Sequence, residues 1–423
     1  MNTESFSYIL KNYDYVANNK DYAIMREIFN QKNISTMLEK GMDPLDYINY
    51  VTNKNKSNIN INNISKVIDK TDINIIDFLN RINARITYIG SGTTGHFFRG
   101  SIYKYYYING SRCRNRLCYF ALKVTGYIKN PHYKSIYQIS RPENTEINMM
   151  SILSRLVIEG KTKHLLLPIK TYYTDIAPFI KMYVEKHIKP ESDKNGKYKD
   201  FVEKYNNGYL ENTVSLLFYE FANGGDLLKF IRANNKKLNS MHWKVIVFQL
   251  LSVLSVIQNR YPSFRHNDLK ANNVLIELTR LDYENINYTN RIIYNIGNKK
   301  YKIPDIGINI KLWDFDFACI PNICENIKVH EHWTNKINIT TKQNRYYDIH
   351  YFFRTLINNA FFPDILSNDP KYTDIKKFIS DVLPPQYISG NKISKYGRLL
   401  VDDEYTTPQK LLETNKYFDE FIF

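Results

Sequence analysis

The stretch RHNDLKANNVLI (Arg265–Ile276) decides the fold of this chain. Asp268 is followed by a lysine two positions later and by an asparagine five positions later, and an apolar run typical of a strand closes the stretch. A carboxylate can accept a hydrogen bond from a reacting hydroxyl, and side-chain oxygens are ligands for hard cations. The spacing predicts a loop that presents Asp268, Lys270 and Asn273 together. The alternative is a capped turn in a basic surface loop.

Two features lie upstream of this loop. Gly90, Gly92 and Gly95 have the spacing G-x-G-x-x-G, which lets a turn approach phosphate groups closely enough for backbone N–H groups to bond them. A plain glycine turn is the alternative. Further on, FALKV (Phe120–Val124) predicts a strand with one inward lysine, Lys123, unless that lysine lies solvated at a strand edge.

A helix is predicted at EINMMSIL (Glu146–Leu153), where apolar residues recur at helical spacing. Glu146 leads this helix and is the favoured partner for Lys123, with Glu143 as its competitor. Both could instead be acidic first-turn residues that suit the helix dipole. The later stretch LLFYEFANGGDLL (Leu216–Leu228) predicts a buried strand, a glycine break and a helix.

In this order, the motifs resemble those of eukaryotic-type serine/threonine protein kinases, from roughly Thr87 to Phe423. The chain is most similar to the virion-morphogenesis kinase of poxviruses and related kinases of other large DNA viruses. The shared traits are DFD (Asp314–Asp316) in place of D-F-G, a long insertion before it, and the block Tyr346–Phe353, with no Ala-Pro-Glu afterwards. The resemblance implies an α+β, bilobal fold, with a β-rich small lobe and a helical large lobe.

The resemblance also implies a reaction and its residues. ATP would phosphorylate Ser or Thr of protein substrates, with Asp268, Lys270 and Asn273 as catalytic residues and with Asn273 and Asp314 as Mg²⁺ ligands. The residues implied to bind ATP are Gly90, Gly92, Gly95, Phe97, Lys123, Glu146, Tyr219, Glu220, Ala222 and Asp226.

Within that set, Phe97 would cover the adenine, and Tyr219 would guard the back of its pocket. The backbone of Glu220 and Ala222 would bond the adenine edge. Asp226 would reach the ribose, or would cap the following helix.

Asp348 would bond the backbone of the catalytic loop and hold it rigid. A surface N-cap is the alternative for this residue.

Two departures from the kinase pattern bear on regulation. Asn267 replaces the Arg of H-R-D, and a neutral amide cannot form a bidentate, charge-assisted pair with a phosphate. Asp316 replaces a glycine that is permissive in its backbone dihedrals. Both changes argue against switching by phosphorylation more than against catalysis.

Composition limits the partners, the location and the metal sites that can be expected. The chain has 58 Lys and Arg against 42 Asp and Glu, a net charge of +16, which favours either an anionic partner or lysine enrichment in an A/T-rich genome. No nucleic-acid motif, secretion signal or long apolar run is apparent, so a soluble, intracellular protein is expected, in the host cytoplasm or the virion by resemblance. Four cysteines, Cys113, Cys118, Cys319 and Cys324, are expected to be free thiols rather than zinc ligands.

The motif positions predict three regions: a helical N-terminal extension over residues 1–84, a small lobe over 85–222 and a large lobe over 223–423. Helices are predicted around Ala23–Lys40 and Ile75–Asn83. Insertions are predicted at 186–212 and 277–310, the second with an exposed hairpin tip near residues 298–302.

Three other function classes stay open at this stage. A pseudokinase would bind nucleotide without transfer, although Lys123, Asp268, Asn273 and Asp314 are all present. A small-molecule kinase of the choline or aminoglycoside type shares H-N-D-like loops, but Lys270 and the full glycine turn favour a protein substrate. A nucleic-acid-binding protein is suggested by charge alone. Oligomeric state and the physiological substrate are not encoded in these motifs.

Overall fold

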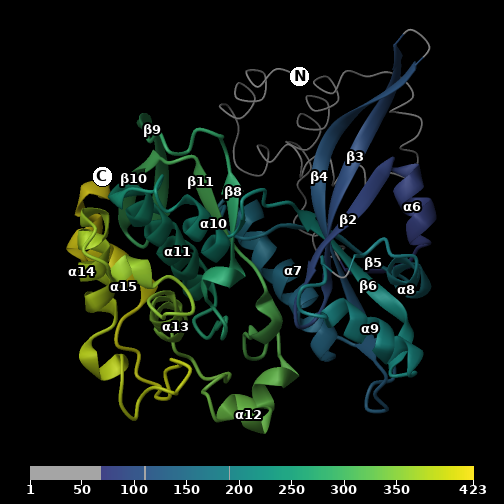
Figure 1. Cartoon of the computed structure of the whole chain (residues 1–423). Coiled ribbons are helices and arrows are strands. Elements are labelled where there is room, and N and C mark those ends of the chain that lie inside the picture. The colour runs from purple at the N-terminus through teal and green to yellow at the C-terminus, as the bar shows by residue number, and fades with distance from the viewer. Residues whose placement is uncertain (1–67, 109–110, 190) are drawn as a thin grey trace. The chain divides into compact units, whose positions relative to one another are not determined.

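The computed structural model describes residues 68–108, 111–189 and 191–423, which fall into two compact units. The first contains residues 68–158 and Leu167–Phe221, and the second contains Glu159–Leu166 and Ala222–Phe423. One is built on a large sheet and the other mainly on helices (Figure 1), which confirms the predicted α+β class. The helix predicted at Ala23–Lys40 lies outside the described residues.

A six-stranded sheet forms the centre of the β-rich unit, with the strand order β1-β5-β6-β4-β3-β2. Only the β1–β5 pair within it is parallel. β1 and β2 both begin before the predicted lobe boundary at residue 85, so the sheet extends into the predicted N-terminal extension. The strands are β1 (Ile68–Asp72), β2 (Ala84–Ser91), β3 (His96–Ile108), β4 (Ser111–Ile128), β5 (Pro168–Asp175) and β6 (Leu210–Glu220).

Helices pack on this sheet through aromatic side chains. The predicted helix near Ile75 is present, and it begins after Asn74, whose side chain accepts hydrogen bonds from the amides of Ile76 and Asp77. Its Phe78 packs against Tyr172 and Phe218 of neighbouring strands. The helices of this unit are α6 (Ile75–Arg81), α7 (Thr145–Ile158), α8 (Ala177–Val184) and α9 (Lys197–Asn206).

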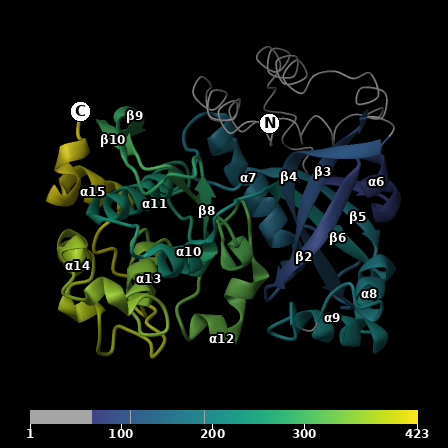
Figure 2. The same cartoon turned by 45° about the horizontal axis from the view of Figure 1, so that its top comes forward.

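The helical unit is built around α11 (Ser240–Arg260), which lies beside α14 and α15 (Figure 2). Asn239 and His242 form a capping box at its first turn. Within the described residues, α11 alone is long and apolar enough to cross a membrane, but most of its side chains are buried inside the unit. The other α-helices here are α10 (Leu227–Asn234), α12 (His332–Asn335), α13 (Tyr347–Leu356), α14 (Thr373–Val382) and α15 (Pro408–Thr414).

Two small sheets complete the helical unit. The first has the order β11-β8-β7, and the second is a β9–β10 hairpin within the predicted insertion at 277–310. The predicted hairpin is present, but Tyr301 within its predicted exposed tip is buried in β10 and packs on Phe248 of α11, so that part of the prediction is wrong. The strands are β7 (Gly225–Asp226), β8 (Val274–Leu278), β9 (Asn287–Ile296), β10 (Lys299–Asp305) and β11 (Ile308–Leu312).

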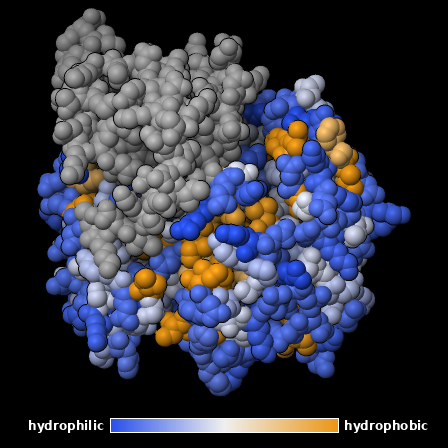
Figure 3. All heavy atoms as spheres, turned by 180° about the vertical axis from the view of Figure 1, so that it is seen from behind, coloured by the Kyte–Doolittle hydropathy of each residue, from blue (hydrophilic) through white to orange (hydrophobic). Residues whose placement is uncertain are grey.

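Figure 3 shows one face of the molecule, on which hydrophilic residues predominate among those described. On the face shown in Figure 3, hydrophobic residues gather in a few patches among hydrophilic ones. The described cysteines, Cys118, Cys319 and Cys324, are buried free thiols, as predicted for them. Within the described residues, no group of three or more His, Cys, Asp or Glu side chains could hold a metal ion.

Candidate active site

The loop that carries Asp268 follows α11 and is anchored from α13. The carboxylate of Asp348 accepts hydrogen bonds from the amides of His266 (2.8 Å) and Asn267 (2.9 Å). Asn267 has a left-handed backbone with φ of 64°, which asparagine tolerates better than most residues. Burial raises the pKa of Asp348, although nearby His266, Arg265 and the two amide bonds oppose that rise. The prediction that Asp348 holds this loop is confirmed.

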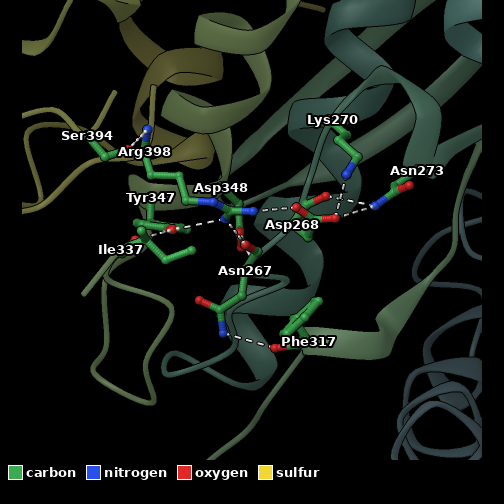
Figure 4. A network of polar contacts seen from close by, with 10 residues as sticks. All are labelled: Asn267, Asp268, Lys270, Asn273, Phe317, Ile337, Tyr347, Asp348, Ser394 and Arg398. Carbon is green, nitrogen blue, oxygen red and sulfur yellow. Dashed lines mark hydrogen bonds and ion pairs between the residues drawn. The ribbon is translucent and has the colours of Figure 1, made fainter. Parts of the chain in front are cut away.

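Asp268 lies at the centre of a polar network (Figure 4). Lys270 donates to its Oδ2 at 2.7 Å, and the Asn273 amide donates to the same oxygen at 3.1 Å and to the Asp268 carbonyl at 2.9 Å. The structure therefore brings together the three residues predicted to be catalytic. A further cation, Arg398, contacts Oδ1 at 2.5 Å and was not found by sequence analysis.

Asn273 and Asp314 are placed by the pairing of β8 with β11. Val274, the first residue of β8, lies opposite Leu312, the last residue of β11. Asn273 precedes β8 and Asp314 comes shortly after β11, so both residues lie at the same end of this antiparallel pair. The Asn273 amide nitrogen is committed to Asp268, which leaves its side-chain oxygen to face away (Figure 4). An amide oxygen and a carboxylate are the donors that Mg²⁺ prefers, so these residues fit the metal.

Asp316 does not need the conformational freedom of the glycine that it replaces. The left-handed residue is instead Asp314, with φ of 60°, and Asp316 lies in the short helix Phe315–Phe317. Its carboxylate forms an ion pair with Lys328. Its carbonyl accepts a hydrogen bond from Asn326 at 2.8 Å. Asp316 thus connects the start of the following segment to η6 (Ile327–His330).

The segment after Phe317 is held by neutral hydrogen bonds and by a buried arginine. The Asn267 side chain donates to the carbonyls of Phe317 (3.0 Å) and Thr340 (3.2 Å). Arg265 is fully buried, lies 3.8 Å from the centre of the Tyr347 ring and donates to the Thr340 hydroxyl at 3.0 Å. Sequence analysis missed the role of Arg265, although it stands in the quoted loop two positions before Asn267.

In the β-rich unit, Lys123 forms a buried ion pair with Glu146. Lys123 is 2% exposed and also donates to the Thr94 hydroxyl at 3.2 Å, so it is not a solvated edge lysine. Glu143, the competing acid, pairs with Arg141 at 3.2 Å instead. The first turn of α7 therefore directs Glu146, and not Glu143, to the inward lysine of β4.

The glycine turn joins β2 to β3. The Gly92 amide donates to the Gly95 carbonyl at 2.9 Å, and Gly90 has φ of 156°. A Cβ at Gly95 would lie 2.7 Å from the Lys123 side chain and 2.9 Å from the Val124 carbonyl, so glycine is required there. Phe97 lies beside this turn, with the Lys123 ammonium 5.3 Å from its ring centre. The turn thus packs closely against Lys123, the lysine predicted to bind phosphate.

The insertion at 186–212 holds the glycine turn by side-chain contacts. Asn195 donates to the Ser91 carbonyl at 2.9 Å, and Lys197 donates to the Thr93 hydroxyl at 3.3 Å. Asp193 accepts from the Tyr88 hydroxyl at 3.3 Å and from the first amides of α9. Sequence analysis had read this stretch only as a hydrophilic insertion.

The residues predicted to surround adenine are divided between the two units. Tyr219 and Glu220 end β6, where the Glu220 carboxylate accepts from the Leu167 amide at 2.9 Å. Ala222 and Asp226 belong to the helical unit. Asp226 is the N-cap of α10 and accepts from the Lys229 amide at 2.9 Å, so the predicted capping role is confirmed.

Sequence comparison with known proteins finds viral kinases among the relatives of this chain. The family described as "Poxvirus serine/threonine protein kinase" matches residues 222–397. "Putative serine/threonine-protein kinase R400" of Acanthamoeba polyphaga mimivirus is 44% identical over 343 residues, which cover 81% of this chain and 70% of that protein. "Putative serine/threonine-protein kinase R301" of the same virus is 37% identical over 93 residues, 22% of each chain.

This extent of similarity confirms the resemblance drawn from the motifs, and it favours none of the alternative function classes. The chain belongs to the family of viral serine/threonine protein kinases.

Proposed function

We propose that this kinase transfers the γ-phosphoryl group of ATP to a Ser or Thr hydroxyl through the network around Asp268. The observation that carries the proposal is the arrangement of Lys270 and Asn273 on one carboxylate oxygen, in a loop whose backbone is fixed by Asp348. Such a fixed carboxylate can orient a hydroxyl for in-line attack, which is the main requirement of this reaction.

Each surrounding residue has a defined part in the proposal. Asp268 accepts the hydrogen bond of the substrate hydroxyl, and Lys270 steadies the γ-phosphate. Lys123, held by Glu146, bonds the α- and β-phosphates, and the glycine turn covers them. The adenine is assigned to Phe97, Tyr219, Glu220 and Ala222, and the ribose to Asp226.

Asn273 and Asp314 would hold Mg²⁺. When bound, the metal supplies positive charge against the phosphate oxygens. In Asp314→Ala we expect ATP affinity to lose its dependence on Mg²⁺, measured by titration calorimetry with and without the metal. An unchanged Mg²⁺ dependence in this variant would remove Asp314 from the metal site.

The decisive test is Asp268→Asn in the full chain, assayed with radiolabelled ATP and a generic protein substrate. We expect transfer to fall by about 10²–10⁴-fold, the usual contribution of a positioned acid–base group, while ATP binding and thermal stability are kept. The matched control is Asp282→Asn, because Asp282 is an exposed aspartate of the same unit. Transfer close to wild type in Asp268→Asn would overturn the assignment.

We also propose, from the viral family, that the kinase works in the host cytoplasm or in the virion. Immunoblots of purified virions and of infected-cell cytosol test this location, and absence from both would contradict it.

A further inference from the structure

Asp268 has a third side-chain partner that comes from a distant part of the chain. The Arg398 guanidinium contacts Oδ1 through Nη2 at 2.5 Å, across a separation of 130 residues. Its Nη1 donates to the Asn267 carbonyl, so one planar group binds both the carboxylate and the backbone of the same loop (Figure 4). The family match ends at residue 397, one position before this arginine.

Contacts to two tyrosines and a turn with Ser394 hold Arg398 in place. It is 7% exposed, its guanidinium lies 4.0 Å from the centre of the Tyr351 ring, and Nη1 contacts the Tyr347 hydroxyl at 3.2 Å. Its backbone closes a turn with Ser394, whose amide donates to the Arg398 carbonyl at 2.8 Å and whose hydroxyl accepts from the Arg398 amide at 2.9 Å. The arginine is therefore pre-organised before any substrate arrives.

This environment argues against a gate that must swing away. To leave Asp268, the guanidinium would have to give up the ring of Tyr351, the Tyr347 hydroxyl and the Asn267 carbonyl together. Burial opposes the charge of Arg398, but Tyr347, Tyr351 and Asp268 outweigh it and raise the pKa of Arg398 above its usual value. Arg398 therefore keeps its charge, and with it the ion pair to Asp268.

The pair also leaves room for the reaction. An ionised carboxylate has about four lone-pair positions, and the described donors are Lys270 and Asn273 at Oδ2 and Arg398 at Oδ1. With one described donor at Oδ1 and two at Oδ2, a lone-pair position at Oδ1 is left for a substrate hydroxyl. Phosphoryl transfer passes through a loose transition state, so the position of the carboxylate matters more than its basicity.

We propose that Arg398 is a positioning residue that sets the orientation of Asp268 for the incoming hydroxyl. The proposal rests on the proposed function, in which Asp268 receives that hydroxyl. Lys270 and Asn273 hold one carboxylate oxygen from within the loop, and Arg398 holds the other from outside it. Rotation of the carboxylate about its terminal bond is thereby restricted.

The test compares Arg398→Ala, Arg398→Lys and Arg398→Gln in the full chain, by kcat, by KM for ATP and by thermal unfolding. We expect Arg398→Ala to lower kcat by about 10–100-fold with KM for ATP within about threefold, since misplacement by 1 Å can cost that much. Arg398→Lys keeps a cation and should recover part of kcat, whereas Arg398→Gln should not. Added guanidinium at millimolar concentration should partly restore Arg398→Ala.

The matched control is Arg354→Ala. Arg354 donates to the Ile388 carbonyl at 3.2 Å and lies beside Gly397, so it supports the same C-terminal loop without touching Asp268. We expect its kcat to stay close to wild type. An equal loss of kcat in Arg354→Ala would show that general loosening of the loop is responsible, and would overturn the proposal.

A double-mutant cycle separates the inference from the function on which it rests. If Arg398 acts through Asp268, adding Arg398→Ala to Asp268→Asn lowers kcat no further; multiplied losses would overturn the proposal. An active Asp268→Asn single variant would instead refute the proposed function. If Arg398→Ala does not fold, the Lys and Gln variants decide, and equal kcat in those two would also overturn the proposal.

Discussion

The catalytic loop of the helical unit and the glycine turn of the β-rich unit are secured in opposite ways. Arg265, His266 and Asn267 are fully buried, and the amides of His266 and Asn267 are bonded to a buried carboxylate. The glycine turn is partly exposed, and side chains of the 186–212 insertion hold it from outside. The first arrangement favours a single geometry, whereas the second lets the turn adjust, because exposed polar contacts contribute little each.

The largest effect should come from breaking the buried anchor. Asp348→Ala leaves two buried amides without an acceptor, at about 1–3 kcal/mol each, so we expect a clearly lower Tm and a loss of transfer of about 10²-fold or more. Thermal unfolding and initial rates check this. Asp364→Ala on the surface is the control, and a stable, fully active Asp348→Ala variant would show that the loop does not depend on its anchor.

A smaller loss is expected from crowding the glycine turn. In Gly95→Ala the new methyl group would meet the Lys123 side chain and the Val124 carbonyl, so we predict a fall of about 10-fold or more in kcat/KM for ATP. Gly92→Ala meets only the Phe97 ring, at 3.0 Å, and should be milder. The reverse order of the two variants would mean that the turn is arranged differently around Lys123.

Acid should weaken the helical unit more than the β-rich unit. In the helical unit, burial lowers the pKa of His164 to about 3 and that of His350 to about 4, and it also lowers the pKa of His242. In the β-rich unit, the described histidine whose pKa is lowered by burial is His96.

Because these folded-state pKa values lie below the unfolded value near 6.5, the unfolded chain takes up protons first. The stability due to neutral histidines is present above that value and is lost as pH falls toward 4. His350→Gln should therefore reduce the drop in Tm between pH 7.5 and pH 5 by a few °C. An unchanged drop would exclude His350 as a source of acid sensitivity.

The smallest effect should come from loosening the insertion. Asn195→Ala removes one exposed hydrogen bond to the glycine turn, so we expect KM for ATP to rise by about two- to threefold with kcat unchanged. Asn206→Ala, on the exposed face of α9, is the matched control. If Asn195→Ala abolished activity, the glycine turn would depend on its Asn195 hydrogen bond as strongly as the catalytic loop depends on Asp348.

Local patterns predicted much of this molecule, because its motifs are short and carry their own geometry. The strand–loop order around Asp268 and the cap at Asp226 follow from residue types at fixed spacing, whereas the anchoring by Asp348, 82 residues from His266, was predicted from the family resemblance. Arg398 could not be found in this way, since its 130-residue separation from Asp268 is closed only by the tertiary fold. The supporting role of Asn195 was hidden for a related reason, because its hydrophilic surroundings have the composition of a solvated loop.

The covering of α11 has a consequence for how the chain is made. Phe248 of this helix packs against Tyr294 and Tyr301 of the β9–β10 hairpin and against Phe418 and Phe421, near the last residue of the sequence. During translation this long apolar helix therefore leaves the ribosome before the aromatic side chains that cover it. Until they arrive, the apolar side chains of α11 lack this cover, so the nascent helix has the features of a chaperone-binding segment.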